Sequence, residues 1–112
     1  MDTKNMIWEE MLFAMQALGE CRLMMRQPGD WYVSQDVEIK SGMCLESRYG
    51  DGVNPEQAVL DYWNKLTILK PGEYVVVGGT SEKREAFEWR GFMWARVNEK
   101  IMQEIYMENG RR

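Results

Sequence analysis

The side chains that most often carry out catalysis are scarce in this sequence. The chain has no histidine, so it lacks the commonest general base and the commonest metal ligand. Its two cysteines, Cys21 and Cys44, form no CxxC pair, which leaves a zinc site almost no ligands. We expect both to be free, buried thiols. With no spacing typical of an activated nucleophile, the sequence predicts a protein that is not an enzyme and needs neither metal nor cofactor.

Three carboxylates could gather on the open face of a small sheet. Asp36, Glu38 and Glu46 fall on predicted strands, and carboxylate oxygens are the ligands that divalent cations prefer. Exposed strand carboxylates are more often cross-strand partners of arginines. We expect them to pair with arginines 22, 26 and 48.

Aromatic and arginine side chains interleave around Gly91. A terminal hairpin buries only one of its faces on a single core, so the other should keep an exposed tryptophan beside an arginine. That composition is enriched in binding hot spots. The predicted partner-binding residues are Trp89, Arg90, Phe92, Trp94 and Arg96.

Two other interpretations of this hairpin stay open. A final helix could cover its second face through Ile101 and Ile105, which would make the aromatics core residues. Aromatics and arginines can also stack on bases and hold phosphates. Glutamates at positions 82, 85 and 88 neutralise the local positive charge, so we expect no direct nucleic-acid binding.

The first element is predicted to be a helix over residues 3–19, with Thr3 or Asn5 as its N-cap and Gly19 as its end. Its apolar arc is wider than one small sheet can cover. We expect it to associate with a second copy of the chain, although its methionines could equally fill a core. The predicted self-association residues are Met6, Ile7, Trp8, Met11 and Met15.

The remaining patterns predict an α+β fold. Residues 22–26, 31–40 and 43–48 read as a three-stranded antiparallel meander, with turns at 28–30 and 41–42. Asn54, Pro55 and Gln57 are typical of a capped helix start, and Pro71 ends that crossing helix. Strands are expected at 73–77, 85–89 and 92–97, the last two forming a C-terminal hairpin, and a final short helix ends at 109–110.

The segment Gly50-Asp51-Gly52 lies directly before the capped helix. Backbone N–H groups there could bind an anion. A tight turn into the helix also requires glycine, and we favour this second interpretation.

Composition limits the classes of function. The 112 residues make one domain, with a net charge of −4 and no run of basic residues that would hold nucleic acid or an anionic membrane. The apolar stretch at 11–18 contains Gln16 and follows two glutamates, so it predicts neither a membrane span nor a signal peptide. We expect a cytoplasmic protein.

Two segments of the chain carry family resemblances. The run from Tyr49 to Ala58 is similar to the strand-loop-helix step of HicB-type and double-stranded-RNA-binding-like domains, but it lacks their basic cluster. With the Asp61-Tyr62-Trp63 helix and the closing Arg90-Gly91-Phe92-Met93-Trp94, the chain resembles small accessory proteins of bacteriophages and prophages, among them anti-CRISPR inhibitors. This resemblance implies a non-enzymatic protein that blocks a host protein or protein–nucleic acid complex, such as a defence effector, inside the host cell. The alternative is a small nucleic-acid-binding or regulatory module that uses the C-terminal hairpin.

Overall fold

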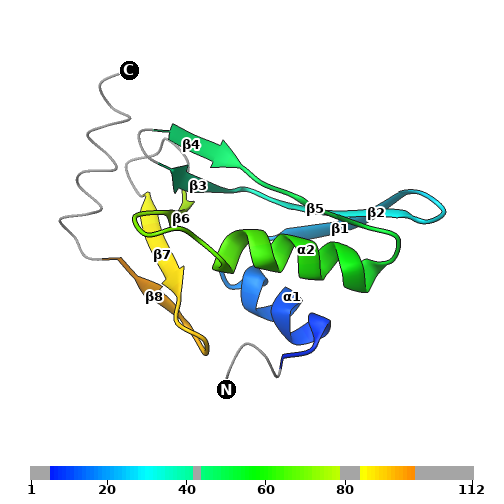
Figure 1. The fold of residues 1–112 in the computed structure, drawn as a ribbon, viewed down its shortest axis with the longest axis horizontal. Coiled ribbons are helices and arrows are strands. Elements are labelled where there is room, and N and C mark those ends of the chain that lie inside the picture. Colours follow the sequence, from blue (N-terminus) through cyan, green and yellow to red (C-terminus); the bar gives the residue numbers. More distant parts are fainter. Residues whose placement is uncertain (1–5, 42–43, 79–83, 98–112) are drawn as a thin grey trace.

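A computed structural model describes residues 6–41, 44–78 and 84–97. In these residues the chain forms two helices and eight strands, which confirms the predicted α+β class (Figure 1). The elements are α1 (Trp8–Gln16), β1 (Cys21–Gln27), β2 (Asp30–Gln35), β3 (Val37–Ser41), β4 (Cys44–Ser47), β5 (Gly50–Gly52), α2 (Pro55–Thr67), β6 (Tyr74–Val77), β7 (Glu85–Trp89) and β8 (Trp94–Arg96).

The strands form two antiparallel sheets. One has the order β1-β2-β5 and the other the order β4-β3-β6-β7-β8. The predicted pairings of the meander are present, but its middle strand is divided at Asp36, so that β2 and β3 belong to different sheets. The segment 50–52, predicted as a turn, is instead strand β5, paired with β2.

Helix α2 begins as its sequence predicts. The Asn54 side chain accepts a hydrogen bond from the Gln57 N–H at 2.9 Å, and Pro55 occupies the first turn. The Gln57 side chain reaches back to accept from the Val53 N–H at 3.3 Å. The helix ends at Thr67, earlier than predicted, because the chain leaves helical geometry at Ile68 ahead of Pro71.

Helix α1 is shorter than predicted. It begins at Trp8 with no side-chain cap at Ile7, and the predicted caps Thr3 and Asn5 lie outside the described residues. After Gln16 the chain tightens into i→i+3 hydrogen bonds up to Gly19. The predicted final helix also lies outside the described residues.

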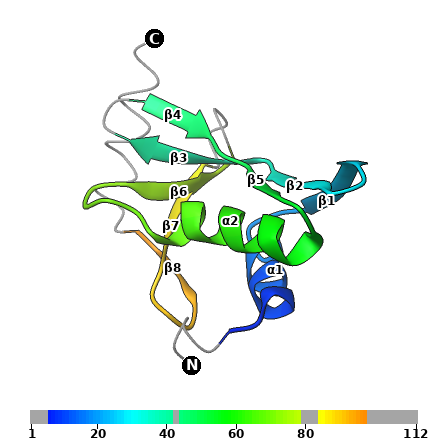
Figure 2. The same ribbon diagram turned by 45° about the vertical axis from the view of Figure 1, so that its right-hand side comes forward.

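The main core lies between α2 and the sheets. Helix α2 buries one face composed of Ala58, Val59, Tyr62, Trp63 and Leu66. Glycines at positions 50 and 52 let β5 approach α2 closely, since a Cβ at Gly50 would lie 2.3 Å from the Ala58 carbonyl oxygen. Figure 2 shows α2 crossing beneath β2, β3, β4 and β5, with α1 on the side of α2 away from β3 and β4.

A buried glutamine fixes the end of α1. The Gln35 amide donates to the carbonyls of Met15 and Gly19 at 2.6 and 2.7 Å, and its oxygen accepts from the Tyr62 hydroxyl at 3.1 Å. Three hydrogen bonds therefore join β2, α1 and α2 without leaving this polar side chain unsatisfied. Burial raises the pKa of Tyr62 far above its usual value, so its hydroxyl remains a donor.

Candidate protein-binding groove between α1 and the β7–β8 hairpin

The C-terminal hairpin places its two tryptophans opposite each other. Trp89 on β7 pairs with Trp94 on β8, so both side chains lie on the same face. The Arg90 N–H donates to the Met93 carbonyl at 3.0 Å, and Gly91 takes a positive φ of 90° that suits glycine in this turn. The hairpin extends the five-stranded sheet at one edge.

Three tryptophans connect this hairpin to the two helices. Trp63 is 1% exposed, and its ring centroid lies 4.9 Å from that of Trp89 and 6.1 Å from that of Trp94, with the rings steeply inclined. The Trp94 indole N–H donates to the Ala14 carbonyl at 2.8 Å. We call Trp63, Trp89 and Trp94 the tryptophan cluster.

The tryptophan cluster changes the interpretation of the predicted binding residues. Trp89 and Trp94 are half-buried and pack against the main core, so the expectation of an exposed tryptophan beside an arginine is wrong. The exposed aromatic of the hairpin is Phe92, which is 64% exposed at the turn. The reason is the cross-strand register, which turns both tryptophans toward α2.

An apolar groove of about 630 Å³ runs between α1 and the hairpin. Figure 1 shows α1 and the turn between β7 and β8 on the same side of α2. Phe13 on α1 is 82% exposed and faces this groove across from Phe92. The apolar lining consists of Met6, Phe13, Ala14 and Ala17 from the N-terminal segment and Trp89, Phe92, Met93 and Trp94 from the hairpin.

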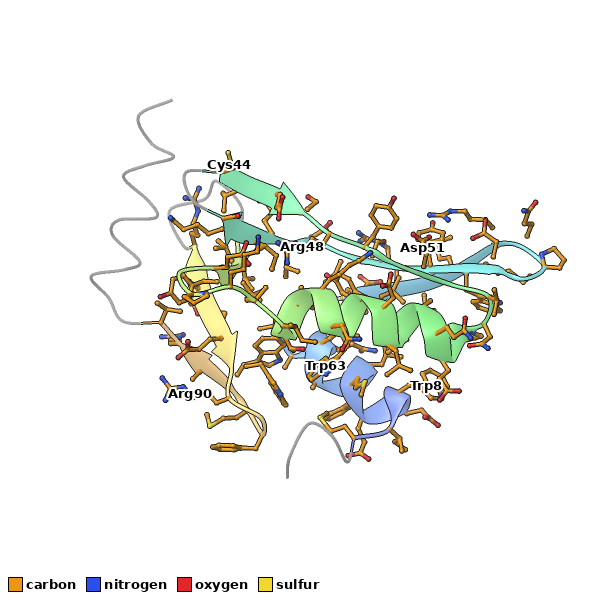
Figure 3. All side chains as sticks on the ribbon, in the orientation of Figure 1. Trp8, Cys44, Arg48, Asp51, Trp63 and Arg90 are labelled. Carbon is orange, nitrogen blue, oxygen red and sulfur yellow. The ribbon has the colours of Figure 1, made fainter. Side chains whose placement is uncertain are left out.

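The charged residues that line the groove are both acidic. Glu9 and Glu10 lie in the first turn of α1, where carboxylates also interact favourably with the helix dipole. Arg90 does not line the groove, and Figure 3 places it on the side of the hairpin away from α1.

The two predicted hairpin arginines are held by carboxylates of the hairpin itself. Arg90 lies 3.0 Å from Glu88, and Arg96 lies 3.0 Å from Glu85. Both pairs are exposed and contribute little to stability, but they reduce the positive potential available to a phosphate. The arginines are therefore not part of the groove, whereas Trp89, Phe92 and Trp94 are.

The predicted self-association residues are dispersed. Met11 and Met15 are buried inside the monomer, so they offer no surface to a second copy, contrary to the expectation. Met6 and Trp8 are half-buried against the core, and Ile7 is 56% exposed. One side of the wide apolar arc of α1 is covered by α2 and by the hairpin. Helical periodicity alone cannot reveal these contacts.

Two of the three carboxylates considered as metal ligands pair with arginines. Asp36 pairs with Arg22 at 3.1 Å, which lowers the pKa of this carboxyl, and Glu46 pairs with Arg48 at 2.6 Å. Among the described residues, no three histidine, cysteine, aspartate or glutamate side chains gather closely enough to hold a metal ion. The expected pairing with an arginine is confirmed for Asp36, whereas Glu46 pairs with Arg48 two residues along the same segment and not across strands. Arg26 pairs instead with Asp30 and Asp51.

The glycines before α2 serve packing. The Asp51 N–H donates to the Asp61 carboxylate at 2.9 Å, and the Val53 N–H is taken by Gln57, so these donors are occupied. A carboxylate already facing this segment disfavours a bound anion. The two glycines instead allow β5 to contact α2.

The two cysteines differ in environment. Both are free, as predicted, and Cys21 is half-buried, with its pKa raised to about 11 by burial. Cys44 is exposed, which corrects the expectation that it is buried. Its position on β4, at the edge of the five-stranded sheet, explains the exposure.

Comparisons with protein-family models, curated proteins and solved structures found no match to this chain. In the described residues, neither helix is long and apolar enough to cross a bilayer.

Proposed function

We propose that this protein is a non-enzymatic binding protein whose apolar groove receives part of a macromolecular partner. The observation that carries the proposal is the pair Phe13 and Phe92, exposed on opposite walls of the groove. Large exposed apolar patches rimmed by polar groups mark interaction sites more often than chance exposure does.

The walls of the groove are already in place before binding. The tryptophan cluster and the Trp94–Ala14 hydrogen bond fix the hairpin relative to α1. Ordering the site on binding therefore costs little, and burial of two aromatic side chains supplies affinity.

The partner we propose is a host protein or protein–nucleic acid complex, such as a defence effector, which the protein blocks by occupying its surface. The support is the resemblance to phage accessory proteins together with the net charge of −4, which would steer the protein toward a basic surface. The nucleic-acid-binding alternative has less support, because Arg90 and Arg96 are paired with glutamates and the tryptophan rings contact one another.

Capture of partners from a cell lysate tests the proposal when three proteins are compared. These are the wild-type chain, a Phe13→Ser/Phe92→Ser variant, and a Met24→Ser/Met25→Ser control that alters exposed apolar residues on β1. Circular dichroism first verifies that each variant is folded.

We expect the wild-type and control proteins to capture the same partner. Calorimetry with that purified partner should show binding to the Phe13/Phe92 variant that is weaker by at least about 2 kcal/mol. Equal affinity of all three proteins for that partner would refute the groove as the binding site.

A further inference from the structure

The groove presents mainly side chains, and few free backbone groups, to a binding partner. After its uncapped first turn, helix α1 bonds its N–H and C=O groups internally, and the Ala14 carbonyl also accepts from Trp94. The hairpin turn is closed by the Arg90–Met93 hydrogen bond, and β8 is only three residues long. An extended peptide needs a row of unpaired backbone groups, whereas a helix satisfies its own. The groove therefore suits a helix that inserts apolar side chains.

The charge of the rim constrains that helix further. Glu9 and Glu10 are the charged side chains of the groove lining, and in the described part of the chain neither has an ion-pair partner. Burying an acidic partner beside them would bring like charges together, while lysine or arginine would be complementary. The helix dipole accounts for carboxylates in this turn but leaves their outward charge unpaired.

From this charge complementarity, we infer that the groove binds an amphipathic helix of the partner protein, with large apolar residues on one face and lysine or arginine beside them. The inference rests on the proposed function and specifies its ligand. Phe13 and Phe92 contact the apolar face, and Glu9 and Glu10 contact the flanking basic residues.

Two synthetic probes test this inference. One is a fluorescent amphipathic helical peptide with leucines on one face and lysines on the other, and the second replaces every lysine with glutamate. Fluorescence anisotropy measures the affinity of each peptide for the wild-type chain, for Phe13→Ser and for Glu9→Gln/Glu10→Gln. The matched control is Glu56→Lys, which raises the net charge by the same two units in the first turn of α2.

We expect the lysine peptide to bind the wild-type chain and to bind the Glu9/Glu10 variant roughly tenfold more weakly. Its binding to that variant should no longer depend on salt concentration, and its affinity for Glu56→Lys should change little. Phe13→Ser should weaken binding at least as much. The glutamate peptide should bind at least tenfold more weakly than the lysine peptide.

Three results would overturn the inference. Equal binding of both peptides, lost in Phe13→Ser, would show an apolar site without charge selection, and the proposed function would stand. Failure of both peptides would exclude this class of ligand, and the lysate comparison decides the proposed function separately. A dimer in sedimentation that dissociates on Phe13→Ser would show that a second copy occupies the groove.

Discussion

The close approach of β5 to α2 at Gly50 gives the sharpest stability prediction. Gly50 on β5 faces α2 so closely that an alanine Cβ would lie 2.3 Å from the Ala58 carbonyl oxygen and 2.6 Å from the Tyr62 N and Cβ atoms. Ordinary contacts begin near 3.4 Å, so Gly50→Ala would require β5 and α2 to separate by roughly 1 Å. Gly50 does not have a positive φ, so the requirement for glycine is one of space.

The expected cost follows from this geometry. Overpacking a core costs about 1–3 kcal/mol when side chains can adjust. Here the obstructing atoms are backbone or Cβ atoms of a buried helix face, so we expect at least about 3 kcal/mol. For a domain of this size that lowers the melting temperature by roughly 12 °C or more.

Thermal and urea unfolding, followed by circular dichroism, measure this effect. Gly29→Ala is the control, because Gly29 has a φ of +79° and an added Cβ would meet nothing within 4 Å, so only backbone strain of about 1 kcal/mol is expected. A Gly50→Ala protein as stable as the Gly29→Ala protein would refute the packing argument.

Three further predictions concern other parts of the molecule. Trp94→Phe keeps an aromatic ring but removes the hydrogen bond to the Ala14 carbonyl, and should cost about 1 kcal/mol in urea unfolding; unchanged stability would contradict this role. Burial raises the pKa of the half-buried Cys21 thiol to about 11, so at pH 8 it should react with iodoacetamide at least about tenfold more slowly than exposed Cys44. Equal reaction rates of the two cysteines, measured by peptide mapping, would contradict the burial argument. Burial would raise the pKa of Asp61, but hydrogen bonds from the backbone and Lys65 outweigh it and lower that pKa. The stabilising contribution of the Asp61 carboxylate should therefore be complete above about pH 4 and be lost as the pH falls through the lowered pKa. Asp61→Asn should destabilise the protein at pH 7 but not in strong acid. An equal loss of stability at both pH values would contradict this.

The elements that the sequence predicts best are those fixed by local signals. The start of α2 depends on Asn54, Pro55 and Gln57, which lie within four residues of one another. The β1–β2 and β7–β8 hairpins are likewise joined by short turns, at 28–29 and 90–93. In each case neighbouring residues determine the structure, so a single sequence is sufficient.

The division of the predicted meander depends on pairing between distant segments. Buried and more exposed positions alternate from Val33 to Ile39 without interruption, so the polar run of Ser34, Gln35 and Asp36 does not by itself mark the point where β2 ends and β3 begins. The division arises because residues 31–33 pair with β5 while residues 37–40 pair with β6. For the same reason Gly50 and Gly52 resembled a turn, since their close contact with α2 is tertiary.

The groove could be predicted only in part. The sequence identified Trp89, Phe92 and Trp94 as candidate binding residues, but it did not reveal that Trp63 would hold both tryptophans. The opposite wall is α1, about 80 positions earlier in the chain, as the Trp94–Ala14 hydrogen bond shows. Helical spacing places Phe13 outside the narrow apolar stripe formed by Ile7, Met11 and Met15, and this position agrees with its 82% exposure in the structure.

Amide chemical-shift mapping tests the central claim, that the groove between α1 and the hairpin is the binding site, most directly. The ¹⁵N-labelled protein is titrated with the lysine-bearing amphipathic peptide, and Trp94→Phe assigns the Trp94 indole N–H signal. We predict saturable shifts at Phe13, Ala14, Phe92, Met93 and the Trp94 indole, with none along β1. Shifts confined to β1, or no saturable shift at the groove residues, would contradict the account.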